Sequence, residues 1–206
     1  TDIQALGTDI ANLNTAAMHA LTSEQLAALT TAQVAGFDSI DVAALTSLAV
    51  EGLNSAQIAA LSATNGFNAL TTADLEALTS AAISGITPAQ IGTLDTAEIQ
   101  ALGTDIANLN TAAMHALTST QLAALTTAQI SGFDSVDIAA LTTPEVSGLT
   151  SAQIAVLSAT NGFNAFTTAD LDALTSAAIS GITPAQIGTL DTAEIQALNV
   201  DIANLN

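Results

Sequence analysis

The chain contains no lysine and no arginine, and this absence excludes whole classes of partner. Its 206 residues include 19 acidic side chains, which give a formal net charge of −19. A surface without cationic side chains cannot neutralise a phosphate backbone, so we expect no nucleic-acid binding. Anionic membrane surfaces repel such a chain for the same reason. The acids stand singly along the sequence, which is typical of the solvated face of a folded protein.

Cysteine is absent as well, so no disulfide staples the fold. Half of the chain is hydrophobic, but every leucine is soon followed by a hydroxyl or an acid. No run approaches the roughly 18 apolar residues of a membrane span, and we expect no membrane insertion. The sequence has no initiating methionine and no signal peptide, and it starts and ends within its own pattern. We therefore interpret it as a segment of a longer protein. The lack of trypsin sites would suit an extracellular material.

What the chain does contain is one eight-residue unit, repeated almost throughout. Residues 21–36 read LTSEQLAA and LTTAQVAG, two copies of this octad. Position one is a large apolar residue and position two is Thr, Ser, Asp or Asn. Position five is usually Gln, Glu or Asp, position six is Ile, Val or Leu, and a small pair closes the unit. An internal period of this kind decides the fold class.

The octads are nested in a longer repeat of 96 residues. Residues 7–102 recur as 103–198 with 13 substitutions, most of them conservative. We therefore divide the chain into the end of a preceding repeat (1–6), super-repeat 1 (7–102), super-repeat 2 (103–198) and the start of a third repeat (199–206). Twelve units fill each super-repeat, because a seven-residue unit and a nine-residue unit compensate for one another.

Each octad predicts one very short helix. A cap residue at position two with Gln, Glu or Asp three residues later forms a capping box, which satisfies two free backbone donors at a helix start. Pro88 and Pro184 follow their cap threonines at the first helical position, where a missing N–H costs little. Pro144 stands one place later, still in the first turn. The boxes include Thr22 with Gln25, Thr30 with Gln33, Asp38 with Asp41, Asn54 with Gln57, Thr71 with Asp74, Thr87 with Gln90, and Asp95 with Glu98.

The alternatives to short helices fit the sequence less well. In one long helix the apolar stripe would spiral around the rod, and the caps and prolines would be misplaced. A β-solenoid conflicts with the abundant Ala and Gln, and period-two alternation is absent. One or two helical turns are unstable alone, so the units must stack. We predict an all-α solenoid with Leu and Ile inside and Thr, Ser, Gln and Asp outside. Three or four octads per superhelical turn remain equally possible.

The nine-residue units, 61–69 and its copy in super-repeat 2, are candidates for a special role. Each contains an Asn-Gly pair, Asn65-Gly66 and Asn161-Gly162, which is a turn signal through positive φ. One hypothesis is a protruding loop that contacts a ligand or a neighbour. The favoured alternative is a phase correction, with Phe67 and Phe163 in the core.

The histidines and acids are weak candidates for metal ligands. His19 and His115 follow the seven-residue units, and their octad position suggests exposed side chains. No second histidine or cysteine accompanies either, whereas a metal site needs several converging ligands. Asp38, Asp41, Asp95 and Glu98 could bind calcium if stacked units brought them together, but no EF-hand spacing is present. Capping is the stronger interpretation, because carboxylates suit helix N-termini. We expect no cofactor beyond a possible calcium ion.

No catalytic constellation is visible. Serine and threonine abound, but the nucleophile–base arrangements of hydrolases need a unique local geometry, and this chain repeats everything. We therefore expect that the protein is not an enzyme.

The tracts ALTTAQVAGF, LTSEQLAAL and ITPAQIGTL resemble the short LTTAQI-type repeats of very long bacterial cell-surface and secreted proteins, many of them adhesin-like. The resemblance covers essentially the whole chain. It implies a secreted or surface-attached structural role and transfers no catalytic residue.

Two functions follow as hypotheses. The first is a building block of an extracellular bacterial filament, sheath or adhesin stalk. Uncapped solenoid ends expose apolar surface, and stacking on another copy or on more of the same array would cover it. The second is a surface binding module that presents Thr, Asn and Gln to a carbohydrate, a host receptor or ice. Glycans linked to exposed hydroxyls at position three are a further possibility.

Overall fold

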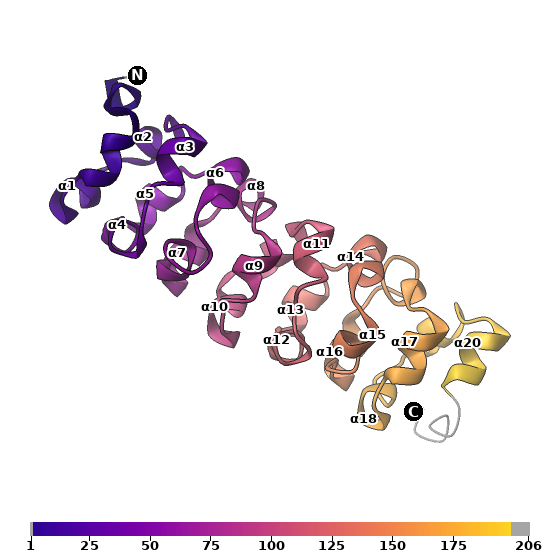
Figure 1. Ribbon diagram of the computed structural model, residues 1–206. Helices are drawn as coiled ribbons and strands as arrows, with labels where there is room; N and C mark the ends of the chain where they lie inside the picture. The colour runs from indigo at the N-terminus through magenta and orange to yellow at the C-terminus, as the bar shows by residue number, and fades with distance from the viewer. Residues whose placement is uncertain (1, 199–206) are drawn as a thin grey trace. The chain divides into compact units, whose positions relative to one another are not determined.

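The structure is a computed structural model that describes residues 2–198, and within this range it contains helices and no strand. The α-helices of these residues are four to six residues long, which confirms the prediction of an all-helical fold with one very short helix per regular octad (Figure 1). The predicted start of a third repeat, 199–206, lies outside the described residues.

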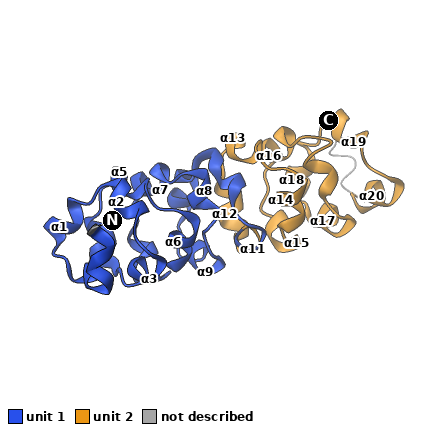
Figure 2. Cartoon of the chain, turned by 90° about the horizontal axis from the view of Figure 1, so that it is seen from above, with its two compact units in different colours: residues 1–113 blue, residues 114–206 orange. Residues whose placement is uncertain are grey.

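The chain forms two compact units, residues 1–113 and 114–206 (Figure 2). The helices of the first unit are η1 Asp2–Asn12, α1 Thr15–His19, α2 Ser23–Ala27, α3 Thr31–Val34, α4 Ser39–Ala44, α5 Ser47–Val50, α6 Ser55–Ala60, η2 Phe67–Ala69, α7 Thr72–Ala77, α8 Ser80–Ile83, α9 Pro88–Ile91, α10 Thr96–Ala101 and η3 Gly103–Asn108, where η marks a 3-10 helix.

Helix α11, Thr111–Met114, contains the division between the units. The helices of the second unit are α12 Ser119–Ala124, α13 Thr127–Ile130, α14 Ser135–Ala140, α15 Thr143–Val146, α16 Ser151–Val156, η4 Phe163–Ala165, α17 Thr168–Ala173, α18 Ser176–Ile179, α19 Pro184–Ile187 and α20 Thr192–Ala197.

The helices start where the capping boxes predict. In α2 the cap Thr22 is extended (φ −94°, ψ 163°), its hydroxyl accepts from the Gln25 N–H at 3.2 Å, and the Gln25 side chain accepts from the Thr22 N–H at 2.9 Å. The same reciprocal pair is present in α3 and α9, with Thr30–Gln33 and Thr87–Gln90. Helix α4 stops about one turn later because Leu45, the large residue that opens the next octad, is again extended (ψ 153°), and Leu61 and Leu78 end α6 and α7 in the same way.

The core of each unit consists of positions one and six. Leu21 and Leu26 of one octad are 7% and 0% exposed, and the same two positions are buried in most other octads. Burial of one leucine side chain is worth about 1.5–3 kcal/mol. A four- to six-residue helix cannot form alone, so this packing between octads is what keeps the helices folded.

Within each unit, helices that pack together lie three octads apart in the sequence. In the first unit α2 packs on α5 and α3 on α6, and in the second unit α13 packs on α16 (Figure 1). Hydrogen bonds between successive turns join residues 24 to 32 positions apart. One superhelical turn therefore takes between three and four octads. Three and four both divide the twelve units of a super-repeat, so the sequence alone did not decide how many octads form a turn.

Candidate functional site

The contacts that join one turn of the solenoid to the next are built around position five of the octad. Gln90 at this position is 0% exposed. Its side-chain oxygen accepts from the Thr87 N–H at 2.8 Å, which completes the capping box of α9. Its side-chain nitrogen donates to the carbonyl oxygens of Ile58 and Leu61 in the preceding turn, at 2.7 and 2.9 Å. One side-chain amide thus completes the N-terminal cap of a helix and hydrogen-bonds that helix to the preceding turn.

The same joint recurs in both units. Gln57 donates to the carbonyl oxygens of Leu26 and Leu29, both at 2.8 Å. In the second unit Gln153 donates to the Leu122 and Leu125 carbonyls, and Gln186 to those of Ile154 and Leu157. We call these four residues, Gln57, Gln90, Gln153 and Gln186, the joint glutamines.

The prediction that Gln and Asp lie outside is therefore wrong for much of position five. The buried polar residues there are Gln33, Asp41, Gln57, Asp74, Gln90, Gln121, Gln129, Glu145, Gln153, Asp170 and Gln186. A signal for this was present in the sequence. A capping box accepts Glu as readily as Gln, yet in this very acidic chain Gln is the commoner residue at position five. The preference indicates that the amide hydrogens are needed.

Aspartate at position five makes a joint of opposite polarity. The Asp74 carboxylate accepts from the Thr71 N–H at 2.8 Å and from the Ser47 hydroxyl of the preceding turn at 2.7 Å. In the second unit Asp170 accepts from the Thr143 hydroxyl at 2.9 Å in the same way. These joints use a carboxylate as acceptor where the joint glutamines use an amide as donor.

A third kind of joint needs no side chain at all. In α8 position five is Ala82, which is buried, and the octad ends with Gly85. A Cβ at Gly85 would overlap the backbone of Ser55 in the preceding turn, and the Gly52–Ser23 and Gly181–Ser151 pairs are equally close. Glycine at these places lets two backbones touch.

The four acidic candidates for calcium binding are occupied as caps. Asp38 accepts from the N–H groups of Ile40 and Asp41, and the Asp41 carboxylate accepts from the Asp38 N–H at 3.1 Å. Asp95 and Glu98 form the same reciprocal pair at 2.8 and 2.7 Å. Burial raises the pKa of Asp41; the Asp38 N–H opposes this shift and the Asp38 carboxylate adds to it. The pKa of Asp137, the equivalent residue in the second unit, is raised for the same reasons.

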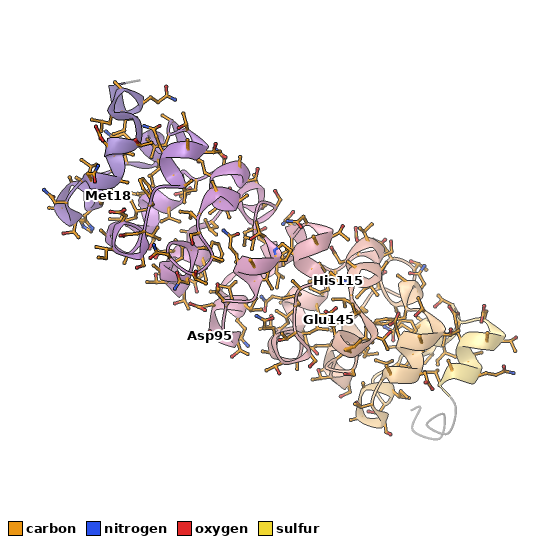
Figure 3. The ribbon with its side chains drawn as sticks, in the orientation of Figure 1. Met18, Asp95, His115 and Glu145 are labelled. Atoms are coloured by element: carbon orange, nitrogen blue, oxygen red, sulfur yellow. The ribbon has the colours of Figure 1, made fainter. Side chains whose placement is uncertain are left out.

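Both histidines lie exposed at the surface, as predicted. The Nδ1 atom of His19 lies 3.2 Å from the Ala44 carbonyl oxygen, and that of His115 lies 3.1 Å from the Ala140 carbonyl oxygen. Figure 3 labels His115 together with the buried Met18. Among the described residues, no three His, Asp or Glu side chains converge in a way that could hold a metal ion.

The nine-residue units are phase corrections of the octad pattern. Phe67 and Phe163 are both 0% exposed and lie in the core, as the favoured alternative predicts. The expectation of positive φ at the Asn-Gly pairs is wrong, because Gly66 and Gly162 have φ of −173° and −177°, which is extended backbone. Asn65 and Asn161 are exposed, whereas Gly66 and Gly162 are buried. In Gly66 the absent side chain makes room for the Phe37 carbonyl oxygen.

The seven-residue units contain the two glycines with positive φ. Gly7 has φ 53° and Gly103 has φ 56°, a region that favours glycine. Both units form 3-10 helices, η1 and η3, instead of α-helices. In η3 the Asp105 carboxylate accepts from the Ser80 hydroxyl of the preceding turn at 2.9 Å. The seven-residue unit therefore still takes part in the stacking.

These features define a class of protein: a helical repeat protein whose turns are joined by recurrent hydrogen bonds. The chain belongs to the ALTTAQ repeat family, whose repeat matches residues 1–39, 67–104, 104–135 and 163–200, more than half of the chain. No curated protein matches the sequence. Within the described part of the chain, no helix is both long enough and apolar enough to cross a membrane.

Proposed function

We propose that this chain is a structural building block whose solenoid turns continue end to end in an extracellular bacterial filament, sheath or adhesin stalk. The observation that carries the proposal is the joint at position five. Each joint glutamine donates to carbonyl groups of the turn before it, and the octads of Gln57 and Gln153 offer carbonyl groups to the joint glutamine of the turn after. The octad of Gln57 shows both roles, since Gln57 donates to the carbonyl of Leu26, and Gln90 of the next turn donates to the carbonyl of Ile58, the residue that follows Gln57. Such a joint is directional and can be repeated without limit.

The repeat sequence supports the extracellular setting and a bacterial source. It resembles the repeats of long bacterial surface and secreted proteins, and it offers no lysine or arginine to trypsin-like proteases. The proposal assigns no catalytic role and no cofactor. Its partner is the chain itself, through more copies of the same turn, with surface glycans on exposed hydroxyls as an addition.

One residue allows a direct test of end-to-end stacking. Gln25 occupies position five in α2 and completes a capping box, but it is exposed, and its side-chain nitrogen has no partner among the described residues. In a stack of two copies it is placed to donate to carbonyls of a preceding turn, as Gln57 does. Gln25→Glu keeps the capping box and replaces this donor with an acceptor.

The experiment compares the native chain with Gln25→Glu by analytical ultracentrifugation and negative-stain electron microscopy over a concentration series. We expect elongated assemblies of the native chain and a shift towards monomers in the variant, with unchanged circular dichroism. Compact monomers of the native chain at every concentration would overturn the proposal. A glycan array and an ice-recrystallisation assay run alongside; specific binding there without self-association would establish the surface binding module instead.

A further inference from the structure

The two super-repeats can be compared residue by residue, and the substitutions between them are not evenly spread along the sequence. Of the 13 substitutions, most exchange similar side chains, such as Val34 for Ile130. Four change the charge of the side chain or replace leucine by proline, and they lie at two places in the sequence, at position 24 and at positions 48–51. They are Glu24, Leu48, Ala49 and Glu51 in super-repeat 1, against Thr120, Pro144, Glu145 and Ser147 in super-repeat 2.

In the first unit these four residues meet at one place on the surface. Helices α2 and α5 are three octads apart and pack side by side (Figure 1). Between them lies a hollow of about 380 Å³ lined by Leu21, Thr22, Ser23, Glu24, Thr46, Leu48 and Ala49. A second hollow of about 260 Å³ continues from Ser23 and Glu24 to Glu51 and Gly52. We call the two hollows together the Leu48 groove.

The apolar wall of this groove is formed by an exposed leucine. Leu48 is 72% exposed, the most exposed large apolar side chain of the described residues. It stands at position four of its octad, where Ala is the usual residue and is exposed. In the second unit Pro144 takes this place, and α15 forms with the same length as α5. Ile40 and Val136, at the same position of other octads, are 64% and 62% exposed, but Leu48 in addition lines a hollow that contains Glu24.

The charge of the groove identifies what its partner must carry. Glu24 and Glu51 are both exposed and line the same hollow. The chain has no lysine and no arginine, so neither it nor a second copy can supply a side-chain ammonium or guanidinium group for these carboxylates. A complementary partner is cationic and brings an apolar side chain beside its charge.

We propose that the Leu48 groove binds a basic segment of another protein, with Lys or Arg side chains at Glu24 and Glu51 and an adjacent apolar side chain on Leu48. The second unit lacks this site. Thr120 and Ser147 remove both carboxylates, and Glu145 is 9% exposed and used as the capping-box acceptor of α15. The two super-repeats therefore share the joints of the solenoid but not the groove, so the inference goes beyond the proposed structural role.

The test uses two blocked pentapeptides as probes, Gly-Lys-Leu-Lys-Gly and its uncharged analogue Gly-Gln-Leu-Gln-Gly, each N-acetylated and C-amidated. Binding to the full chain is followed by ¹H–¹⁵N NMR at about 0.15 M salt, where long-range attraction is screened. We expect the Lys peptide to shift the backbone amide signals of α2 and α5, but not those of α12 and α15, and the Gln peptide to bind much more weakly.

Three variants decide the outcome. The fourfold exchange E24T/L48P/A49E/E51S takes residues that super-repeat 2 already carries, so it keeps the fold; we expect affinity to fall about tenfold or more. Leu48→Ala alone keeps both carboxylates and loses part of the affinity. The control E76Q/D172N removes two exposed acids elsewhere and leaves affinity unchanged. Equal binding to all variants would show diffuse attraction to an acidic surface and overturn the proposal, as would equal binding of the Gln peptide. Displacement of the Lys peptide by Ca²⁺ from every variant alike would overturn it as well.

Discussion

Helices α7 and α9 are both joined to the preceding turn through position five, but α9 uses a hydrogen-bond donor and α7 an acceptor. Both carry a buried polar residue at position five that closes a capping box and reaches the preceding turn. In α9 the Gln90 amide donates to two carbonyl oxygens, whereas in α7 the Asp74 carboxylate accepts from the Ser47 hydroxyl. Between them, α8 has Ala82 at position five and packs backbone on backbone through Gly85.

The comparison shows that the residue at position five is matched to what the turn before it presents. In α9 the carbonyl groups of the preceding turn meet the donor of glutamine, in α7 a hydroxyl meets the acceptor of aspartate, and in α8 the contact is between two backbones. A capping box alone does not distinguish these cases, because its acceptor oxygen is common to Gln, Glu and Asp. Substitutions that exchange donor, acceptor and glycine therefore separate the role in the joint from the role in the cap.

The largest effect is expected for Gln90→Glu. The variant keeps the capping-box oxygen but places a buried carboxylate against the carbonyl oxygens of Ile58 and Leu61, with no cation to compensate. An uncompensated buried charge costs about 3–5 kcal/mol, which urea unfolding at pH 7 measures. The introduced carboxyl has a raised pKa in the folded state. Its penalty is therefore small below the ordinary Glu pKa of about 4.3 and grows as pH rises through the raised value.

The matched control is Gln25→Glu, which makes the same exchange at an exposed position five. We expect its free energy of unfolding to stay within about 0.5 kcal/mol of the native value. Equal destabilisation by the two variants would mean that the cap, and not the joint, is what the glutamine supports.

The next effect concerns the joint without a side chain. Gly85→Ala places a methyl group where the Ser55 backbone lies, and overpacking of this kind costs about 1–3 kcal/mol. Gly92→Ala makes the same change at the C-cap of α9, where the nearest heavy atom is 3.5 Å away and the backbone is helical. There we expect a gain of about 0.4–1 kcal/mol from reduced freedom of the unfolded chain. Thermal unfolding should show a lowered melting temperature for Gly85→Ala and a raised one for Gly92→Ala. A destabilised Gly92→Ala would contradict this account.

A smaller effect is expected for the acceptor joint. Ser47→Ala removes the hydroxyl that donates to Asp74 and should cost about 1 kcal/mol. Asp74→Asn keeps an oxygen for the Thr71 N–H but presents an amide nitrogen on its other side. In a double-mutant cycle the two changes should show a coupling of about 1 kcal/mol. Full additivity would show that the hydroxyl and the carboxylate act independently.

The smallest effect concerns the raised pKa of Asp41. A carboxyl whose pKa is higher in the folded state contributes stability below its ordinary pKa of about 3.9 and loses that contribution as pH rises through the folded value. Asp41→Asn cannot titrate and still offers an oxygen to the Asp38 N–H. Relative to the native chain, the variant should gain stability on going from acid to neutral pH, by less than about 1 kcal/mol. Asp137→Asn in the second unit should give the same pH profile, and a gain in the acid direction would contradict the sign.

Features within a single octad were sufficient to predict where the helices begin. Thr22 and Gln25 are three residues apart, and whether they cap one another depends on nothing beyond the octad. The first and sixth positions were equally predictable, because a helix too short to be stable alone must bury Leu21 and Leu26 against something. Phe67 in the core followed from the same reasoning, applied to a unit one residue too long.

The Asn65-Gly66 pair shows where local reasoning failed. The pair permits positive φ, but Phe37 of the preceding turn lies against Gly66, and this contact requires a small residue and not a left-handed one. A contact across a turn cannot be inferred from the residues on either side of it.

The sequence by itself determined the period, the helix starts and the apolar core, because capping and amphipathic spacing act over three or four residues. Only the tertiary structure decided that Gln90 is buried, that Gly85 lies against Ser55, and that Glu24 shares a groove with Leu48. Each of these depends on residues 24 to 32 positions away. That distance is set by a superhelical turn of between three and four octads, which arises from packing and is not encoded in any single unit.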